Sequence, residues 1–175
     1  LILNPNSHTI NFNIGNSLKK QGRLEEALMA YKKALTIEPN NSNAYNNMGN
    51  ILHDQGKLEE AIAAYDKAIK IKPEFSEAHN NMGIALNNMG KPEDAIDSYT
   101  KAISIRPDFA DAYVNMSFAK LKTKQWNHGI LLQKWRWETE KFLAYKRYFK
   151  APEWDGTSPI YSKTLLVWGE QGPGD

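Results

Sequence analysis

The chain has 175 residues, of which 41% are hydrophobic and 24% charged, and this balance excludes wholesale disorder because disordered chains are poor in apolar residues. The absence of cysteine excludes disulfides and thiolate metal sites and fits a cytoplasmic location, and no apolar run approaches the roughly 18 residues of a membrane-spanning helix. A formal net charge of only +2 does not favour nucleic acid or a membrane as a partner.

The chain repeats itself with a period of 34 residues. A fixed period of this length is the signature of a repeat architecture. Six columns keep the same residue type over three copies, and they are Gly15, Gly49 and Gly83; Gly22, Gly56 and Gly90; Ala27, Ala61 and Ala95; Tyr31, Tyr65 and Tyr99; Ala34, Ala68 and Ala102; and Pro39, Pro73 and Pro107.

The period predicts how the chain is divided. Residues 1–7 are interpreted as the tail of a preceding repeat, since Pro5 lies one period before Pro39. The expected parts that follow are three full repeats at 8–41, 42–75 and 76–109, a degenerate fourth repeat with capping helices at 110–143, and a linker with the first strand of a downstream domain at 144–175.

Each full copy predicts two amphipathic helices. In the second copy the first helix is expected from about Ser42 to Gln55, and Gly56 ends it because glycine takes the left-handed conformation cheaply. The second helix is closed by Pro73, which cannot continue the backbone hydrogen bonds. Gly49 and Ala61 are expected where the two helices cross. One such hairpin cannot cover its own apolar face, so the hairpins should stack.

The fourth copy departs from the pattern, and the chain after it is basic and aromatic. Substitutions break four of the columns, and they are Ser117 for the first Gly, Lys124 for the second Gly, Gly129 for Ala and Gln133 for Tyr. Four aromatic residues of this region are predicted to form an interface, and they are Trp135, Trp137, Tyr145 and Phe149. A cap or a docked domain is the favoured interpretation; nucleobase stacking or membrane contact are the alternatives.

The final segment predicts one isolated strand. Residues 163–168 have the apolar pattern of a buried strand, and a glycine-containing turn follows them. Because a lone strand has unpaired edges, it is expected to pack onto the helices or to pair with another molecule, which leaves a homo-oligomer possible.

One polar column runs through all four copies, and it consists of Asn13, Asn47, Asn81 and Asn115. Asparagine is a poor helix former because its amide competes with backbone hydrogen bonds. A primary amide can donate to a peptide carbonyl and accept from a peptide N–H, so this row predicts a groove that holds an extended polypeptide partner. Four neighbouring amides join the predicted peptide-binding set, and they are Asn16, Asn46, Asn50 and Asn80. The alternative is that these amides bond between helices and fix the stacking angle.

The six columns, with an aromatic residue near the start as in Tyr45 and Tyr113, resemble the tetratricopeptide repeat. The resemblance implies an all-α fold, a right-handed superhelix of helix pairs whose first helices line the concave face, and binding of a protein or peptide. The triplets Asn47-Met48-Gly49 and Asn81-Met82-Gly83 resemble more closely the repeat region of O-linked N-acetylglucosamine transferases. In that family the asparagine ladder binds the backbone of the substrate polypeptide, which implies this role for the four-residue column.

Two further functions remain open at this stage. Residues 135–138, 152–156 and 170–172 resemble the junction in bacterial repeat proteins that are fused to a GT-B-type glycosyltransferase-like domain. The chain would then be the acceptor-binding part of such an enzyme. The other alternative is a self-assembly scaffold. The chain itself is expected to have no catalytic residues, metal or cofactor, because its four histidines lie far apart without metal-ligand spacing.

Overall fold

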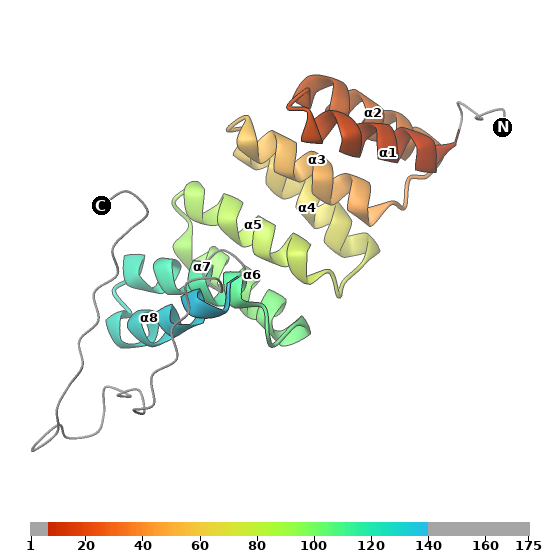
Figure 1. Cartoon of the computed structure of the whole chain (residues 1–175). Helices are drawn as coiled ribbons and strands as arrows, with labels where there is room; N and C mark the ends of the chain where they lie inside the picture. The colour runs from red at the N-terminus through yellow and green to blue at the C-terminus, as the bar shows by residue number, and fades with distance from the viewer. Residues whose placement is uncertain (1–6, 140–175) are drawn as a thin grey trace, which may run out of the picture. The chain divides into compact units, whose positions relative to one another are not determined.

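The computed structural model describes residues 7–139, which contain eight α-helices, one 3₁₀ helix and no strand (Figure 1). The elements are α1 (His8–Lys20), α2 (Leu24–Ile37), α3 (Ser42–Asp54), α4 (Leu58–Ile71), α5 (Ser76–Asn88), α6 (Pro92–Ile105), α7 (Ala110–Lys122), α8 (Trp126–Leu132) and η1 (Gln133–Glu138). Over this part of the chain, none of the helices combines the length and the apolar composition that a bilayer span requires. The predicted all-α solenoid is confirmed.

Local sequence explains where these helices begin and end. Gly56 takes a φ of +74° after α3, and its backbone N–H donates to the carbonyl of His53. The first turn of α4 carries Glu59 and Glu60, whose negative charge is favourable at a helix N-terminus. The helix ends just before Pro73. The same signals recur one period earlier and one period later, so the three full repeats have nearly identical helix boundaries.

Each hairpin closes by packing a tyrosine ring onto a glycine. A Cβ atom built on Gly49 would lie 2.5 Å from Cε1 of Tyr65, and Tyr65 is buried. Gly15 and Gly83 stand in the same relation to their own tyrosines. The sequence correctly marked Gly49 as a close-contact position. The three atoms nearest to a Cβ at Gly49 all belong to the Tyr65 ring, which the sequence had not identified as the neighbour of this glycine.

Neighbouring hairpins stack by burying the first helix of one on the second helix of the preceding one. Ala44 and Ile51 of α3 belong to one core cluster with Ala27 and Tyr31 of α2. Equivalent clusters join α4 to α5 and α6 to α7. The first helices also contact one another from α3 to α5 and from α5 to α7, whereas the second helices make no comparable contacts among themselves. Within this helical part of the chain, the first helices therefore form the inner side of the stack.

The fourth hairpin is shorter and irregular. Its second helix, α8, has only 7 residues and passes directly into η1. Gln133 donates a hydrogen bond to Ser117, so a polar pair replaces the packing of tyrosine on glycine. Lys124 takes a φ of +61° at the position where the other repeats have glycine. The residues 1–6 and the predicted strand at 163–168 lie outside the described residues.

Candidate functional site

The four column asparagines lie on the first helices α1, α3, α5 and α7, one in each hairpin. Asn13 is exposed, whereas Asn47, Asn81 and Asn115 are half-buried. Because the first helices are neighbours in the stack, these amides form a row along its inner side. We call these four residues the amide ladder.

The second and third hairpins are joined through Asn81. Its Nδ2 donates to Oδ1 of Asn46 at 3.1 Å and to Oδ1 of Asn50 at 3.1 Å. These two acceptors precede Asn81 by 35 and 31 residues. Asn50 also accepts a hydrogen bond of 2.9 Å from the hydroxyl of Tyr65. Both N–H groups of the Asn81 amide are therefore committed to the preceding hairpin.

The junction between the first and second hairpins uses one of these two acceptor positions. Nδ2 of Asn47 donates to Oδ1 of Asn16 at 2.9 Å, and it makes a longer contact of 3.4 Å with the hydroxyl of Tyr31. The other acceptor position is occupied by Phe12, which has no acceptor. Tyr31 in turn donates to Asn16 at 2.7 Å.

The junction between the third and fourth hairpins uses the other acceptor position. Nδ2 of Asn115 donates to Oδ1 of Asn80 at 3.0 Å, 35 residues earlier. The position 31 residues earlier is Ile84, which cannot accept. One N–H of the Asn115 amide therefore has no partner among the described residues.

The amide oxygens of the ladder are much less engaged than its N–H groups. Within residues 7–139, Oδ1 of Asn47 and Oδ1 of Asn115 accept no hydrogen bond, and Oδ1 of Asn81 accepts only a long one of 3.5 Å from Asn80. A carbonyl oxygen has two lone pairs and is a strong acceptor. The ladder thus presents a row of acceptors on the inner side of the stack.

The four neighbouring amides have a different position from that of the ladder. Asn46 and Asn80 are buried, with exposed fractions of 7% and 5%, and their oxygens accept from the ladder residue of the next hairpin. Asn16 and Asn50 are half-buried and also accept from the next ladder residue. The geometry therefore gives these four residues the position of supports that orient the ladder, which is the alternative considered from sequence.

Sequence reasoning did not identify the tyrosine hydroxyls as part of this network. Tyr31 and Tyr65 hold the oxygens of Asn16 and Asn50 at a separation of 15 residues in both copies. The sequence does contain a signal for these pairs, because both tyrosines and both asparagines recur with the 34-residue period. Burial raises the pKa of Tyr31, and the hydrogen bond with Asn47 partly offsets this rise, so the hydroxyl stays protonated.

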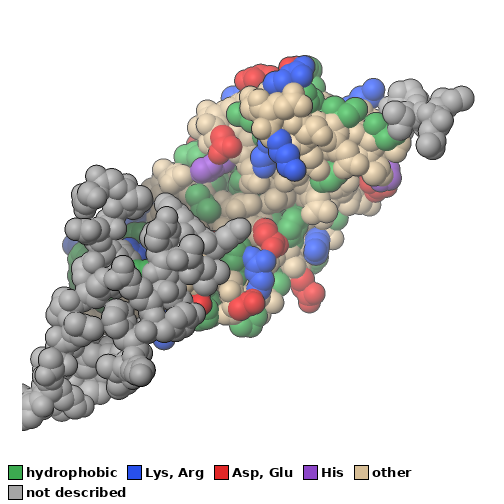
Figure 2. Space-filling view, in the orientation of Figure 1, with side chains coloured by type: hydrophobic (Ala, Val, Ile, Leu, Met, Phe, Trp, Pro, Cys, Tyr) green, Lys and Arg blue, Asp and Glu red, His purple; other side chains and the backbone are tan. Residues whose placement is uncertain are grey.

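Two further bonds join the first helices near their C-terminal ends. The side-chain amide of Asn88 lies 2.9 Å from Nε2 of His53, and Nζ of Lys122 donates to Oδ1 of Asn87 at 3.1 Å. Both pairs are separated by 35 residues, as in the ladder. The three columns that form the ladder network contain no charged residue. On the face drawn in Figure 2, charges of both signs are interspersed rather than gathered by sign.

The predicted aromatic interface is only partly described. Trp135 stacks on Tyr113 with ring centroids 4.1 Å apart and an interplanar angle of 3°, so this ring packs within the chain and caps the fourth hairpin. Trp137 is half-buried, whereas Tyr145 and Phe149 lie outside the described residues. Across residues 7–139, no three His, Asp or Glu side chains are grouped as a metal site would require.

Several solved structures are similar to this one. A crystal structure of MamA has a TM-score of 0.73 and 24% identity, over 82% of this chain and 84% of that chain. PilF of Pseudomonas aeruginosa has a TM-score of 0.71 and 20% identity, over 83% and 64%. The first TPR of Spaghetti (RPAP3), bound to the HSP90 peptide SRMEEVD, has a TM-score of 0.66 and 20% identity, over 69% and 96%. At these identities the likeness concerns the fold alone.

Family models match the repeats directly, although no curated protein matches the chain. A model described as TPR repeat matches residues 15–56 and 49–90, and a model described as Tetratricopeptide repeat matches residues 76–109. Together they cover more than half of the chain, and the two matches of the first model are offset by the 34-residue period. The chain therefore belongs to the tetratricopeptide repeat family, whose members are generally protein–protein interaction modules rather than enzymes.

Proposed function

We propose that the inner side of the stack binds an extended polypeptide through the peptide's main-chain N–H groups. The observation that carries this proposal is that Asn47, Asn81 and Asn115 share one side of the stack, with amide oxygens that accept at most one long hydrogen bond. A peptide N–H is the complementary donor. Because every residue except proline has one, the site would be tolerant of side-chain sequence.

The hydrogen-bond directions determine how each ladder residue would contact the peptide. Both N–H groups of Asn81 are committed to Asn46 and Asn50, so this residue can only accept. Asn115 retains one free N–H, so it can both accept from the peptide and donate to a peptide carbonyl. Donation and acceptance by one amide, as expected from sequence, are thus available at Asn115 but not at Asn81.

Simple geometry gives the spacing along the bound chain. Packed helices lie roughly 8–10 Å apart, and an extended chain advances roughly 3.3 Å per residue. Successive ladder residues would therefore meet the peptide at about every third residue. Since each hydrogen bond contributes only about 0.5–1.5 kcal/mol net, several ladder residues have to bind the peptide at once.

The composition of the ladder columns favours an uncharged peptide segment. The peptide bound by the Spaghetti domain, SRMEEVD, contains three acidic residues. None of the three columns in the ladder network of this chain carries a lysine or arginine that would neutralise them. We therefore expect a neutral segment to bind at least as tightly as an acidic one.

A titration with a defined neutral peptide tests this proposal. The probe is the capped twelve-residue peptide (Ala-Thr-Ser)4, added to ¹⁵N-labelled chain up to millimolar concentration. We expect saturable shifts of the Asn47 and Asn81 side-chain amide signals. Removing one acceptor with Asn81→Ala should weaken binding roughly 2- to 12-fold, which corresponds to one hydrogen bond.

Asn50→Ala is the matched control for folding. Asn81→Ala removes two hydrogen bonds of this junction. Asn50→Ala also removes two, one of this junction and one from Tyr65 within the second hairpin, but it leaves the oxygen of Asn81 in place. We expect both variants to lose a similar amount of stability, about 1–3 kcal/mol, while only Asn81→Ala loses affinity. Equal affinities in the two variants, or no saturable shift with the unmodified chain, would reject the proposal.

A second candidate function is that the chain is the acceptor-binding part of a glycosyltransferase. The polypeptide held in the same groove would then be the acceptor protein. It is supported by the ladder, because an acceptor protein held by its backbone could be presented with little sequence preference. The coding sequence after Asp175 tests it. A sugar-nucleotide-binding domain of the GT-B type is expected there, and a stop codon or an unrelated domain would exclude this candidate.

A further inference from the structure

We propose that the groove prefers a peptide with one large apolar side chain, which packs on Ile84 and Phe118 beside the ladder residue Asn115. We call Ile84 and Phe118 the apolar pair. The inference rests on the proposed function, because the apolar pair would contact a side chain of the same peptide whose main chain binds the ladder. It adds a side-chain preference that the ladder oxygens alone cannot supply.

The apolar pair interrupts a column of amides. This column has asparagine in the first two hairpins, as Asn16 and Asn50, and it changes to Ile84 and Phe118 in the last two. Both asparagines accept a hydrogen bond from the next ladder residue. Isoleucine and phenylalanine cannot take over this role, because neither side chain has an acceptor. The inner side of the stack is therefore polar over the first two hairpins and partly apolar over the last two.

Both members of the apolar pair lie next to Asn115. Phe118 follows Asn115 by three residues on α7, a spacing that places two side chains on the same face of a helix. Ile84 on α5 precedes Asn115 by 31 residues, which is the separation at which Asn50 contacts Asn81. Ile84 is half-buried against the core cluster of α5, α6 and α7, whereas Phe118 is 49% exposed. The apolar pair thus combines a side chain that is fixed by packing with one that is available for contact.

The direction of the side chains in a bound peptide favours this contact. An extended chain that follows the ladder crosses the first helices, so its side chains, which alternate between the two sides of its backbone, point along these helices. Toward the C-terminal ends of α5 and α7 they would meet the apolar pair. Toward the N-terminal ends they would meet the exposed Asp111 and Glu77, which is paired with Arg106 at 2.7 Å. A single apolar side chain therefore fits the groove better than a run of them.

Asn115 is well suited to hold the peptide at this point. Its oxygen, and the N–H that has no partner among the described residues, can bind a main-chain N–H and a main-chain carbonyl of the peptide. Such hydrogen bonds are stronger where water is excluded. An apolar peptide side chain that covers Phe118 would exclude water from these bonds and would remove apolar surface of both partners from water.

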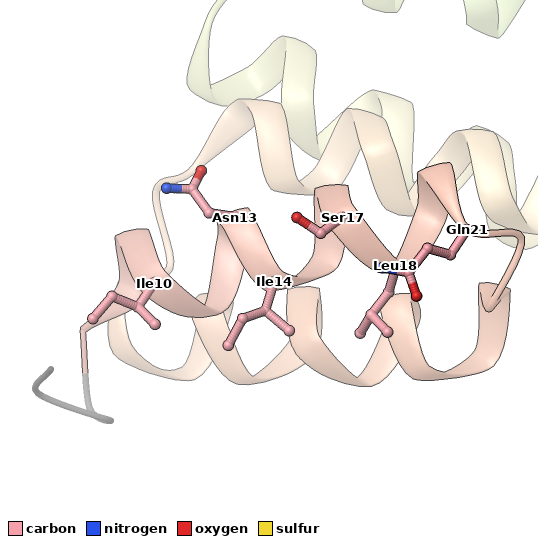
Figure 3. A pocket seen from close by; sticks show the side chains of 6 residues that line it. All are labelled: Ile10, Asn13, Ile14, Ser17, Leu18 and Gln21. Atoms are coloured by element: carbon pink, nitrogen blue, oxygen red, sulfur yellow. The ribbon is translucent and has the colours of Figure 1, made fainter.

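A second exposed apolar residue on a first helix provides a matched control. Figure 3 shows a shallow hollow on α1, and Asn13 and Ile14 are among its lining residues. Ile14 is 46% exposed, close to the value for Phe118, and it is also adjacent to a ladder residue. However, Ile14 belongs to the column of Met48 and Met82, whose side chains pack against the core clusters. Ile14 is therefore not expected to contact a peptide that follows the ladder.

The test compares two capped twelve-residue peptides that differ in one side chain. Both are (Ala-Thr-Ser)4, with either leucine or the similarly branched asparagine in place of the sixth residue, and their affinities for the whole chain are measured by calorimetric titration. We expect the leucine peptide to bind about 5-fold more tightly, because part of one leucine side chain is buried. The asparagine peptide should bind like unmodified (Ala-Thr-Ser)4.

Variants of the chain show where the leucine binds. Phe118→Asn places in the fourth hairpin the residue type that the first two hairpins have in this column, and it should abolish the preference for leucine. Phe118→Leu and the control Ile14→Asn should both keep the preference. Circular dichroism checks that all three variants remain helical, which is expected because Phe118 and Ile14 are about half exposed.

Four results would overturn the inference while leaving the proposed function intact. The first two are equal affinity of the unmodified chain for the leucine and asparagine peptides, and an undiminished preference in Phe118→Asn. The third is loss of the preference in Ile14→Asn, because the leucine would then occupy the hollow on α1. The fourth is self-association in sedimentation velocity that Phe118→Asn abolishes, because a second copy would then cover the apolar pair. Failure of all the peptides to bind would instead reject the proposed function, and this inference with it.

Discussion

The pairing of a glycine with a tyrosine recurs in each full hairpin and determines how closely its two helices approach. Gly49 leaves no room for a methyl group, since its Cβ would lie 2.5 Å from Cε1 of the Tyr65 ring. The fourth hairpin uses Ser117 and Gln133 instead, joined by a hydrogen bond. Both residues of the pair therefore differ together in the fourth hairpin.

Gly49→Ala should therefore destabilise the chain although alanine is the better helix former. Overpacking a close contact costs about 1–3 kcal/mol, against a helix-propensity gain of about 1 kcal/mol. We expect a net loss in the free energy of unfolding, measured by urea denaturation. Adding Tyr65→Leu should make the Gly49→Ala change less costly than it is in the wild-type background, and equal costs in both backgrounds would contradict the packing described here.

Lys124 occupies a backbone position where a change to glycine is expected to stabilise the chain. Its φ of +61° places a residue with a Cβ in the left-handed region, where Gly22, Gly56 and Gly90 stand in the other hairpins. The left-handed conformation costs a non-glycine residue about 1 kcal/mol. Lys124→Gly should therefore raise the free energy of unfolding by up to about 1 kcal/mol, and Gly56→Lys should lower it. A destabilising Lys124→Gly would show that the side chain contributes more than the strain costs.

The sequence identified the ladder but could not give its hydrogen-bond directions. Whether Asn81 points its N–H groups at the preceding hairpin depends on how far α5 is offset from α3, and a repeat period does not contain that offset. The structure supplies it as pairs separated by 31 and 35 residues. The positions of Asn46 and Asn50 as supports follow from this offset and not from their helical periodicity.

At the level of whole elements, the sequence predicted the regular hairpins well and the last one less well. The first helix of the second repeat was expected from about Ser42 to Gln55 and runs from Ser42 to Asp54. Glycine and proline fix these ends locally. The shortening of α8 and its continuation as η1 have no comparable local signal. The packing in this hairpin also differs, since a Cβ at Gly129 would meet the side chain of Leu121 at 2.7 Å.

The tyrosines at the hairpin cores predict alkaline unfolding. Burial raises the pKa of Tyr31, Tyr65 and Tyr99 above the ordinary value of about 10. Their contribution to stability is therefore fully present below about pH 10 and is lost as the pH rises toward the folded-state pKa values. The free energy of unfolding should fall above pH 10, by up to about 1.4 kcal/mol per pH unit for each tyrosine.

Circular dichroism and phenolate absorbance, followed together from pH 8 to 12, measure this loss. Ionisation of the buried tyrosines should coincide with the loss of helix signal. Tyr99→Phe should make the pH dependence less steep, because one titrating group is removed. Unchanged stability up to pH 12 would contradict the burial of these hydroxyls in the hairpin cores.

At the scale of the whole molecule, the structure gives the ladder one role in stacking, and we propose a second role in peptide binding that uses other atoms of the same side chains. The N–H groups of Asn47, Asn81 and Asn115 join each hairpin to the one before. The oxygens accept at most one long hydrogen bond within residues 7–139 and would supply the proposed peptide contacts. The cost of asparagine in the middle of a helix is thereby offset by stacking, and this explains the column even without a bound partner.

The most direct measurement of the proposed function compares two methylated forms of the (Ala-Thr-Ser)4 peptide. One form carries an N-methyl group on every residue and has no main-chain N–H, whereas the other carries O-methyl groups on its serines and threonines and keeps every N–H. Calorimetric titration should show a loss of more than 10-fold for the N-methylated peptide and a change within about 3-fold for the O-methylated one. Equal affinity of the N-methylated and unmodified peptides would contradict recognition of the peptide backbone by the ladder oxygens.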